Sequence, residues 1–205
     1  MNKRYIEATE KARAFLSGRD PVLGGVIERY GVIKYELETA YFDALLSTVI
    51  GQQLSGKVAD TIWKRFVSLA DGGLTPEKVL ALSDEKMRGT GVSGNKARYL
   101  KNIAQAAVEK RIDFDRFREM TDREIIDALT AVKGIGGWTA EMFLIFSLGR
   151  EDVFSNGDGG LERAVNNLYG GGGALRGAER VKKAAEWKPY RSIASLYLWK
   201  SLENK

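Results

Sequence analysis

Apolar residues along this chain recur at three- and four-residue spacing, and the strict alternation of a β-strand is missing almost everywhere. Proline, which interrupts helices, occurs only three times in 205 residues. Helix-capping residues precede several periodic segments; Thr121, for example, is followed three residues later by Glu124. The pattern therefore predicts an all-α protein with roughly ten or more short helices, one of them over 159–169.

Histidine and cysteine are both absent, and this excludes several kinds of chemistry. Without cysteine there is no disulfide, thiolate nucleophile, iron–sulfur cluster or cysteine-ligated zinc. Without histidine there is no Ser-His-Asp triad and no histidine-bound metal. Catalysis would have to use carboxylates, lysine, tyrosine, hydroxyl groups or the backbone. The formal net charge of +5 is mild evidence for a polyanionic partner.

A glycine-rich turn joins two apolar helical segments near residue 134. Gly134 and Gly136 permit a tight turn and the close approach of another backbone. The second helix would present its first N–H groups and its positive dipole end, which suit a phosphate. The alternative is a simple corner between helices in which the glycines only allow packing.

Four segments of this chain follow one another in a specific order and spacing. They are Ile50–Ser55 (Ile-Gly-Gln-Gln-Leu-Ser), Gly91–Ala97, Gly134–Ala140 (Gly-Ile-Gly-Gly-Trp-Thr-Ala) and Trp187–Ser192, the last followed by Trp199. Together they resemble the helix-hairpin-helix DNA glycosylases, and among these the 3-methyladenine DNA glycosylase II branch. The resemblance covers roughly residues 40–202. It implies a two-lobed helical bundle with a cleft between the lobes and a DNA-binding helix-hairpin-helix motif over 129–149.

The resemblance also suggests how the chain divides. We expect residues 36–154 to form one helical lobe that contains the hairpin. The N-terminal helices of 1–35 are expected to pack with the other lobe, residues 155–205, which carries the candidate catalytic residue.

That residue is Asp158, which lies twenty residues after Trp138. In the family an aspartate at this place is the catalytic carboxylate. The alternative role, compatible with the first, is to cap a helix starting near Gly159. A fixed carboxylate would stabilise the positive charge that develops on the sugar as an N-glycosidic bond breaks. An alkylated purine is already cationic, so it can leave without a general acid.

Trp138 stands where family members that also cut the strand carry a nucleophilic lysine. The resemblance therefore implies a monofunctional enzyme, without Schiff-base chemistry. Trp138, Trp199 and Met142, one helical turn after Trp138, are candidates for a pocket around a flipped base. The alternative for each tryptophan is an ordinary place in the core.

Further DNA contacts are expected around these residues. Gln53 or Leu54 would fill the gap that a flipped base leaves, and the sequence does not decide between them. A phosphate would be bound by the backbone N–H groups of Gly134, Ile135, Gly136, Gly137 and Trp138. A monovalent cation would be bound by the carbonyls of Thr130, Val132 and Ile135. Further phosphate contacts or, alternatively, solvated surface charges are Lys96, Arg98, Lys101 and Arg191.

The sequence thus predicts a monofunctional DNA glycosylase of base excision repair that acts on alkylated bases. It is expected to bind damaged double-stranded DNA as a monomer in the cytoplasm, at the nucleoid of a prokaryote, with no membrane contact and no required cofactor. One alternative is a glycosylase for other lesions, such as hypoxanthine, uracil or 1-methyladenine. The other is a non-catalytic helix-hairpin-helix module that only binds DNA.

Overall fold

The computed structural model of the protein describes residues 3–171 and 173–203, so the outermost residues of both expected terminal segments lie outside it. It confirms the all-α class, because helices account for every described element except one short two-stranded ribbon. No helix in the described ranges is long and apolar enough to cross a bilayer. The helices form two compact units, Glu38–Phe143 and the described parts of Met1–Leu37 with Leu144–Lys205.

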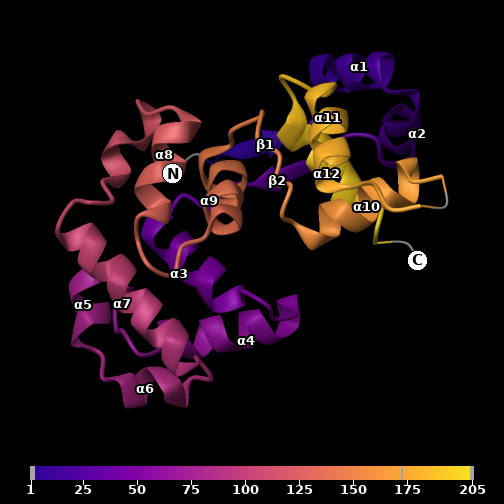
Figure 1. Ribbon diagram of the computed structural model, residues 1–205. Helices are drawn as coiled ribbons and strands as arrows, with labels where there is room; N and C mark the ends of the chain where they lie inside the picture. Colours follow the sequence, from indigo (N-terminus) through magenta and orange to yellow (C-terminus); the bar gives the residue numbers. More distant parts are fainter. Residues whose placement is uncertain (1–2, 172, 204–205) are drawn as a thin grey trace. The chain divides into compact units, whose positions relative to one another are not determined.

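Glu38–Phe143, which we call the hairpin unit, consists of short helices, several of which start at a side-chain cap. The predicted capping box is present: the Thr121 hydroxyl accepts the Glu124 N–H at 3.3 Å, and the Glu124 carboxylate accepts the Thr121 N–H at 2.7 Å. Helices α5 and α6 both pack on α7 (Figure 1). The elements are α3 (Tyr41–Gly51), α4 (Gly56–Val67), α5 (Pro76–Ala81), α6 (Asp84–Gly89), α7 (Gly94–Val108), the 3-10 helix η1 (Phe114–Arg118), α8 (Asp122–Thr130) and α9 (Gly137–Phe143).

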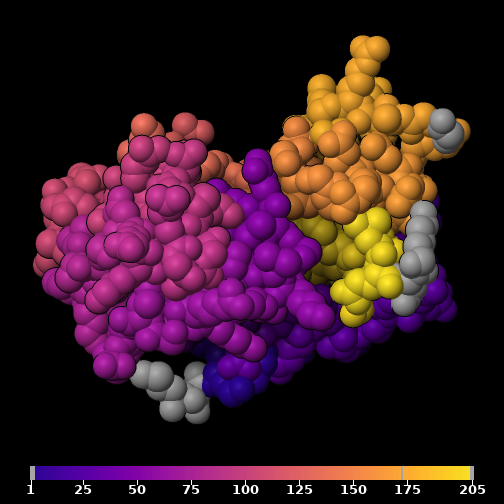
Figure 2. Space-filling model, turned by 90° about the horizontal axis from the view of Figure 1, so that it is seen from below, coloured from indigo at the N-terminus to yellow at the C-terminus, as the bar shows by residue number. Residues whose placement is uncertain are grey.

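The other unit, which we call the terminal unit, contains the ribbon. The sequence predicts only helices over 1–35, but Tyr5 lies in strand β1, where it pairs antiparallel with Glu36 of β2. A three-residue strand is too short to show a period, and its partner is distant in sequence. α10 packs on α12, as the adjoining orange and yellow atoms show (Figure 2). The elements are β1 (Tyr5–Glu7), α1 (Glu10–Arg19), α2 (Pro21–Tyr30), β2 (Lys34–Glu36), the π-helix η2 (Leu144–Leu148), α10 (Gly159–Tyr169), α11 (Gly177–Ala185) and α12 (Arg191–Lys200).

Asp20 is the buried polar centre of the terminal unit, with 2% of its surface exposed. One carboxylate oxygen caps α2 by accepting the Leu23 N–H at 3.1 Å. The other accepts hydrogen bonds from the Trp187 indole at 2.9 Å and the Tyr169 hydroxyl at 2.8 Å, and it pairs with the Lys183 ammonium at 2.9 Å. Burial alone would raise the pKa of Asp20, but these bonds outweigh it and hold the pKa below its ordinary value. The network ties the N-terminal helices to the C-terminal segment.

Residues 144–154 belong with the terminal unit, whereas the lobe expected from the sequence to contain the hairpin extends to residue 154. The physical reason lies in the side chains of this segment. Phe146 packs edge-on against Tyr35, with ring centroids 6.2 Å apart, and against the indole of Trp199 at 5.7 Å. The division between the units therefore falls where α9 passes into η2.

Candidate functional site

Asp158 is the N-cap of α10, which confirms the capping role that the sequence predicts. Its Oδ1 atom accepts the backbone N–H of Leu161 at 2.8 Å. The same oxygen accepts the indole N–H of Trp199 at 2.9 Å. Two donors from two different helices leave the carboxylate little freedom to rotate. The structure thus brings together two predicted site residues, and it makes Trp199 a hydrogen-bond partner of Asp158.

Gly160 provides the space for this pairing. A Cβ atom at Gly160 would lie 2.9 Å from Oδ1 of Asp158 and 3.0 Å from Cδ1 of Trp199, so these side chains would have to shift. The indole also packs on Phe146. Trp199 is therefore fixed on one side by a ring and on the other by the carboxylate.

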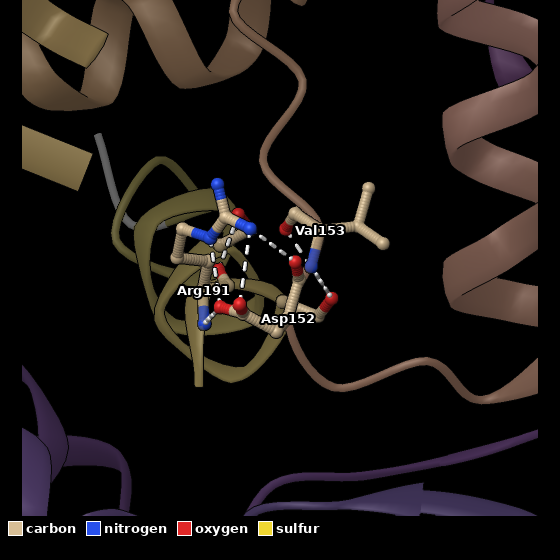
Figure 3. Close-up of polar contacts among 5 residues, drawn as sticks. Asp152, Val153 and Arg191 are labelled. Carbon is tan, nitrogen blue, oxygen red and sulfur yellow. Dashed lines mark hydrogen bonds and ion pairs between the residues drawn. The ribbon is translucent and has the colours of Figure 1, made fainter. Parts of the chain in front are cut away.

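A polar clamp joins the two segments that lead to this pair (Figure 3). Arg191, the first residue of α12, donates from Nε to Oδ1 of Asp152 at 2.7 Å and from Nη2 to Oδ2 at 3.0 Å. The N–H of Val153 donates to the Ser192 hydroxyl at 2.9 Å. The clamp therefore holds the segment before Asp158 against the first turn of α12, which carries Trp199. It also engages the guanidinium of Arg191, which the sequence suggested as a phosphate contact.

In the hairpin unit, α8 and α9 enclose the predicted glycine turn. Gly134 has a φ of +114°, and a Cβ atom there would lie 2.4 Å from the side chain of Tyr99. Only glycine fits this conformation and this space. Ile135 is buried beneath the turn, whereas Gly136 and Gly137 are exposed. The turn is thus anchored on one side and presents glycine backbone on the other.

The expected wedge loop between α3 and α4 is attached to this hairpin. The Gln52 carboxamide donates to the Gly134 carbonyl at 3.3 Å and to the Thr139 hydroxyl at 3.0 Å. Gln53 and Leu54, the two wedge candidates, are both exposed at the tip of the loop. The sequence could not reveal these partners of Gln52, because they lie more than eighty residues away along the chain.

The roles of the candidate base contacts and of the candidate cation ligands remain predictions. Trp138 is 36% exposed and Met142 is 8% exposed, and both belong to the hairpin unit, whereas Asp158 belongs to the terminal unit. Of the three expected cation ligands, the Val132 carbonyl accepts the N–H of Ile135 at 3.0 Å. A carbonyl oxygen has a second lone pair, so this bond is compatible with cation binding.

A basic hollow of about 540 Å³ lies beside the hairpin. Three cationic side chains line it, those of Arg98, Lys101 and Lys133. Lys101 also forms a 2.7 Å ion pair with Asp84. Lys96, by contrast, directs its ammonium toward backbone carbonyls of the hairpin unit, so the structure separates it from the other candidate phosphate contacts.

Comparison with known proteins agrees with this architecture. The family model of the HhH-GPD superfamily base excision DNA repair proteins matches residues 46–189. DNA-3-methyladenine glycosylase 1 of Schizosaccharomyces pombe is 33% identical over 206 residues, covering 97% of this chain and 90% of that protein.

Two solved structures are also similar over nearly the whole chain. A DNA-3-methyladenine glycosidase from Bacillus halodurans has a TM-score of 0.84 and 38% identity, covering 98% of this chain and 93% of that one. The Schizosaccharomyces pombe 3-methyladenine DNA glycosylase in complex with abasic DNA has a TM-score of 0.85 and 33% identity, covering 93% and 96%. The chain belongs to the HhH-GPD superfamily of base excision DNA repair proteins.

Proposed function

We propose that this protein is a monofunctional DNA glycosylase that releases alkylated purines, of the 3-methyladenine and 7-methylguanine type, from double-stranded DNA. The observation that carries the proposal is the aspartate at the start of α10, held at one oxygen by the Leu161 N–H and the Trp199 indole. Relatives named as 3-methyladenine glycosylases support the choice of substrate class.

The chemistry assigned to Asp158 is electrostatic. As the bond between base and sugar lengthens, positive charge develops on the sugar, and a fixed carboxylate stabilises it. The alkylated base leaves with its electron pair and is neutral once released, so it needs no proton from the protein. Water then adds to the sugar and leaves an abasic site. Trp138 has no amine to form a Schiff base, so the strand stays intact.

The hairpin unit would bind the DNA around the flipped nucleotide. Backbone N–H groups from Gly134 to Trp138 would hold a phosphate, and Gln53 or Leu54 would fill the gap in the duplex. Carbonyls of Thr130, Val132 and Ile135 would hold a monovalent cation that screens the phosphate charge.

Trp138, Met142 and Trp199 are each proposed as contacts of the base, and the π faces of the two tryptophans favour a cationic ligand. We infer that a single copy suffices, since every proposed group comes from one chain. In a prokaryote the substrate would place the enzyme at the nucleoid, in the cytoplasm.

Asp158→Asn tests the function directly. Asparagine caps helices as well as aspartate does, so the melting temperature should change little. The loss of the negative charge should lower single-turnover release of 7-methylguanine by about 100-fold or more. The assay is mass spectrometry of bases freed from methylated duplex DNA. For the wild type, strand breaks should appear only after alkali.

The alternatives predict different results. A sister activity would release hypoxanthine, uracil or 1-methyladenine in preference to methylated purines. A binding module would release nothing from a broad lesion panel, and Asp158→Asn would then leave its DNA affinity unchanged.

A further inference from the structure

The loop between α3 and α4, residues 52–55, holds an unfavourable conformation. Gln53 has a φ of +58°, in the left-handed region that residues other than glycine rarely adopt. Leu54 leaves 38% of its surface exposed to water. Such a conformation persists only when surrounding contacts determine it. The contacts that do so identify which residues control the loop.

The main chain of the loop is held by Lys96, in the first turns of α7. Its ammonium donates to the carbonyls of Ile50 at 2.7 Å and Gln52 at 2.8 Å. These carbonyls lie at the C-terminal end of α3, where helix carbonyls lack partners in the helix and a positive charge is favourable. Partial burial lowers the pKa of Lys96, because desolvation disfavours the charged ammonium.

The side chain of Gln52 extends from the same loop to the hairpin. Its Nε2 atom bonds both the Gly134 carbonyl and the hydroxyl of Thr139, and Thr139 is only 1% exposed. A third contact joins α7 to the hairpin directly, from the Asn102 carboxamide to the Lys133 carbonyl at 3.0 Å. Loop, α7 and hairpin are thus joined pairwise by hydrogen bonds.

We propose that Gln52 and Lys96 are positioning residues that hold the loop of residues 52–55 in register with the hairpin, so that insertion into the duplex and grip on the phosphate occur as one step. The proposal rests on the proposed function, since it takes Gln53 or Leu54 as the inserted residue. Neither Gln52 nor Lys96 needs to contact DNA for this role.

A duplex and a bubble substrate separate this role from a general loss of structure. In the duplex the lesion is paired, so opening it requires the inserted residue; in the bubble the lesion is already unpaired. Gln52→Ala and Lys96→Met should lower single-turnover base release from the duplex by about tenfold or more, and from the bubble by less than about threefold. Equal losses on both substrates, or none on either, would overturn the proposal.

The matched control is Gln105→Ala. Gln105 is an exposed glutamine on α7 whose carboxamide bonds Glu109 one turn away. Its replacement should change neither rate. Thr139→Val removes the hydroxyl that Gln52 bonds while nearly keeping the shape. The effects of Gln52→Ala and Thr139→Val should add only in part in the double variant, because both remove the hydrogen bond between Gln52 and Thr139.

Amide hydrogen exchange of the unliganded protein tests whether Gln52 and Lys96 hold the loop, and it requires no enzyme activity. Exchange at residues 52–55 should be faster in Gln52→Ala and Lys96→Met than in the wild type, and unchanged in Gln105→Ala. Unchanged protection in the first two variants would refute the proposal even if the enzyme is active. If the wild type releases no base from either substrate, the proposed glycosylase function is refuted. The exchange data still decide whether Gln52 and Lys96 hold the loop.

Discussion

At the scale of single residues, the helix-cap role of Asp158 and its proposed catalytic role favour the same geometry. A helix cap must accept an N–H at the start of its helix, and an electrostatic catalyst must be fixed before the charge appears. The bond to the Leu161 N–H meets the first need, and the Trp199 indole adds to the second. The sequence predicts the cap, because aspartate before a helical pattern is a local signal. It could not show that Trp199 bonds Asp158, because the two residues are forty-one positions apart.

Gly160→Ala tests this arrangement. The added methyl group would meet Asp158 and Trp199 at about 3 Å. We expect base release to slow by about 10- to 100-fold, although alanine favours a helix by about 1 kcal/mol. Gly159→Ala is the control, since its nearest new contact is Arg163 at an ordinary 3.8 Å. Equal rates in the two variants would show that the close approach at Gly160 does not matter.

Asp20 gives a prediction about pH. Its pKa is lower in the folded protein than the ordinary 3.8, so its contribution to stability is complete above that value. The contribution is lost as the pH falls through the folded-state pKa. Asp20→Asn should lower the free energy of unfolding by about 3 kcal/mol at neutral pH and flatten its dependence on pH below 4. Urea unfolding at several pH values measures both effects, and parallel pH curves would contradict the assignment.

At the scale of elements, most helix starts could be predicted from local sequence signals such as capping residues. The capping box at Thr121 and the helix starting at Gly159 are where the sequence places them. The β-ribbon was missed because three residues show no period and its pairing is long-range. The sequence suggests Lys96 as a phosphate contact or a surface charge, because only the fold reveals the carbonyls around its ammonium.

The hairpin offers a matched pair of glycines. Gly134→Ala would place a methyl group within 2.4 Å of Tyr99 at a positive φ, and it should destabilise the protein by about 2 to 5 kcal/mol. Gly136→Ala meets nothing within 4 Å and should leave the melting temperature nearly unchanged. Thermal unfolding followed by circular dichroism compares them. Similar losses of stability would show that the contact with Tyr99 is not the cause.

At the scale of the whole molecule, the net charge of +5 is less informative than where cations gather. Several basic residues are already engaged within the protein, as Arg191 is with Asp152 and Lys183 with Asp20. The hollow lined by Arg98, Lys101 and Lys133 is a concentration of positive charge next to the hairpin. The sequence supplied these cations but not their grouping, which depends on how α7 meets the turn.

Salt dependence tests whether this hollow contacts DNA. If Arg98 and Lys133 each bind a phosphate, Arg98→Gln and Lys133→Gln should each reduce the slope of log Kd against log salt concentration by about 0.9. Fluorescence anisotropy with undamaged duplex DNA gives the slope. Arg111→Gln is the control, because Arg111 pairs with Glu109 and does not line the hollow. Slopes equal to that of the wild type would show that Arg98 and Lys133 do not contact DNA phosphates.

The two units also differ in the stage of translation at which all of their residues have been synthesised. The hairpin unit is one continuous stretch, whereas the terminal unit combines the described N-terminal residues with helices that follow residue 143. A growing chain emerges from its N-terminus, so Asp20 is synthesised well before its partners Tyr169, Lys183 and Trp187. A chain interrupted before α12 would contain the hairpin but lack Trp199. Asp158 would then be present without the Trp199 indole that bonds it. Its carboxylate gains this second hydrogen-bond donor only once α12 has been synthesised.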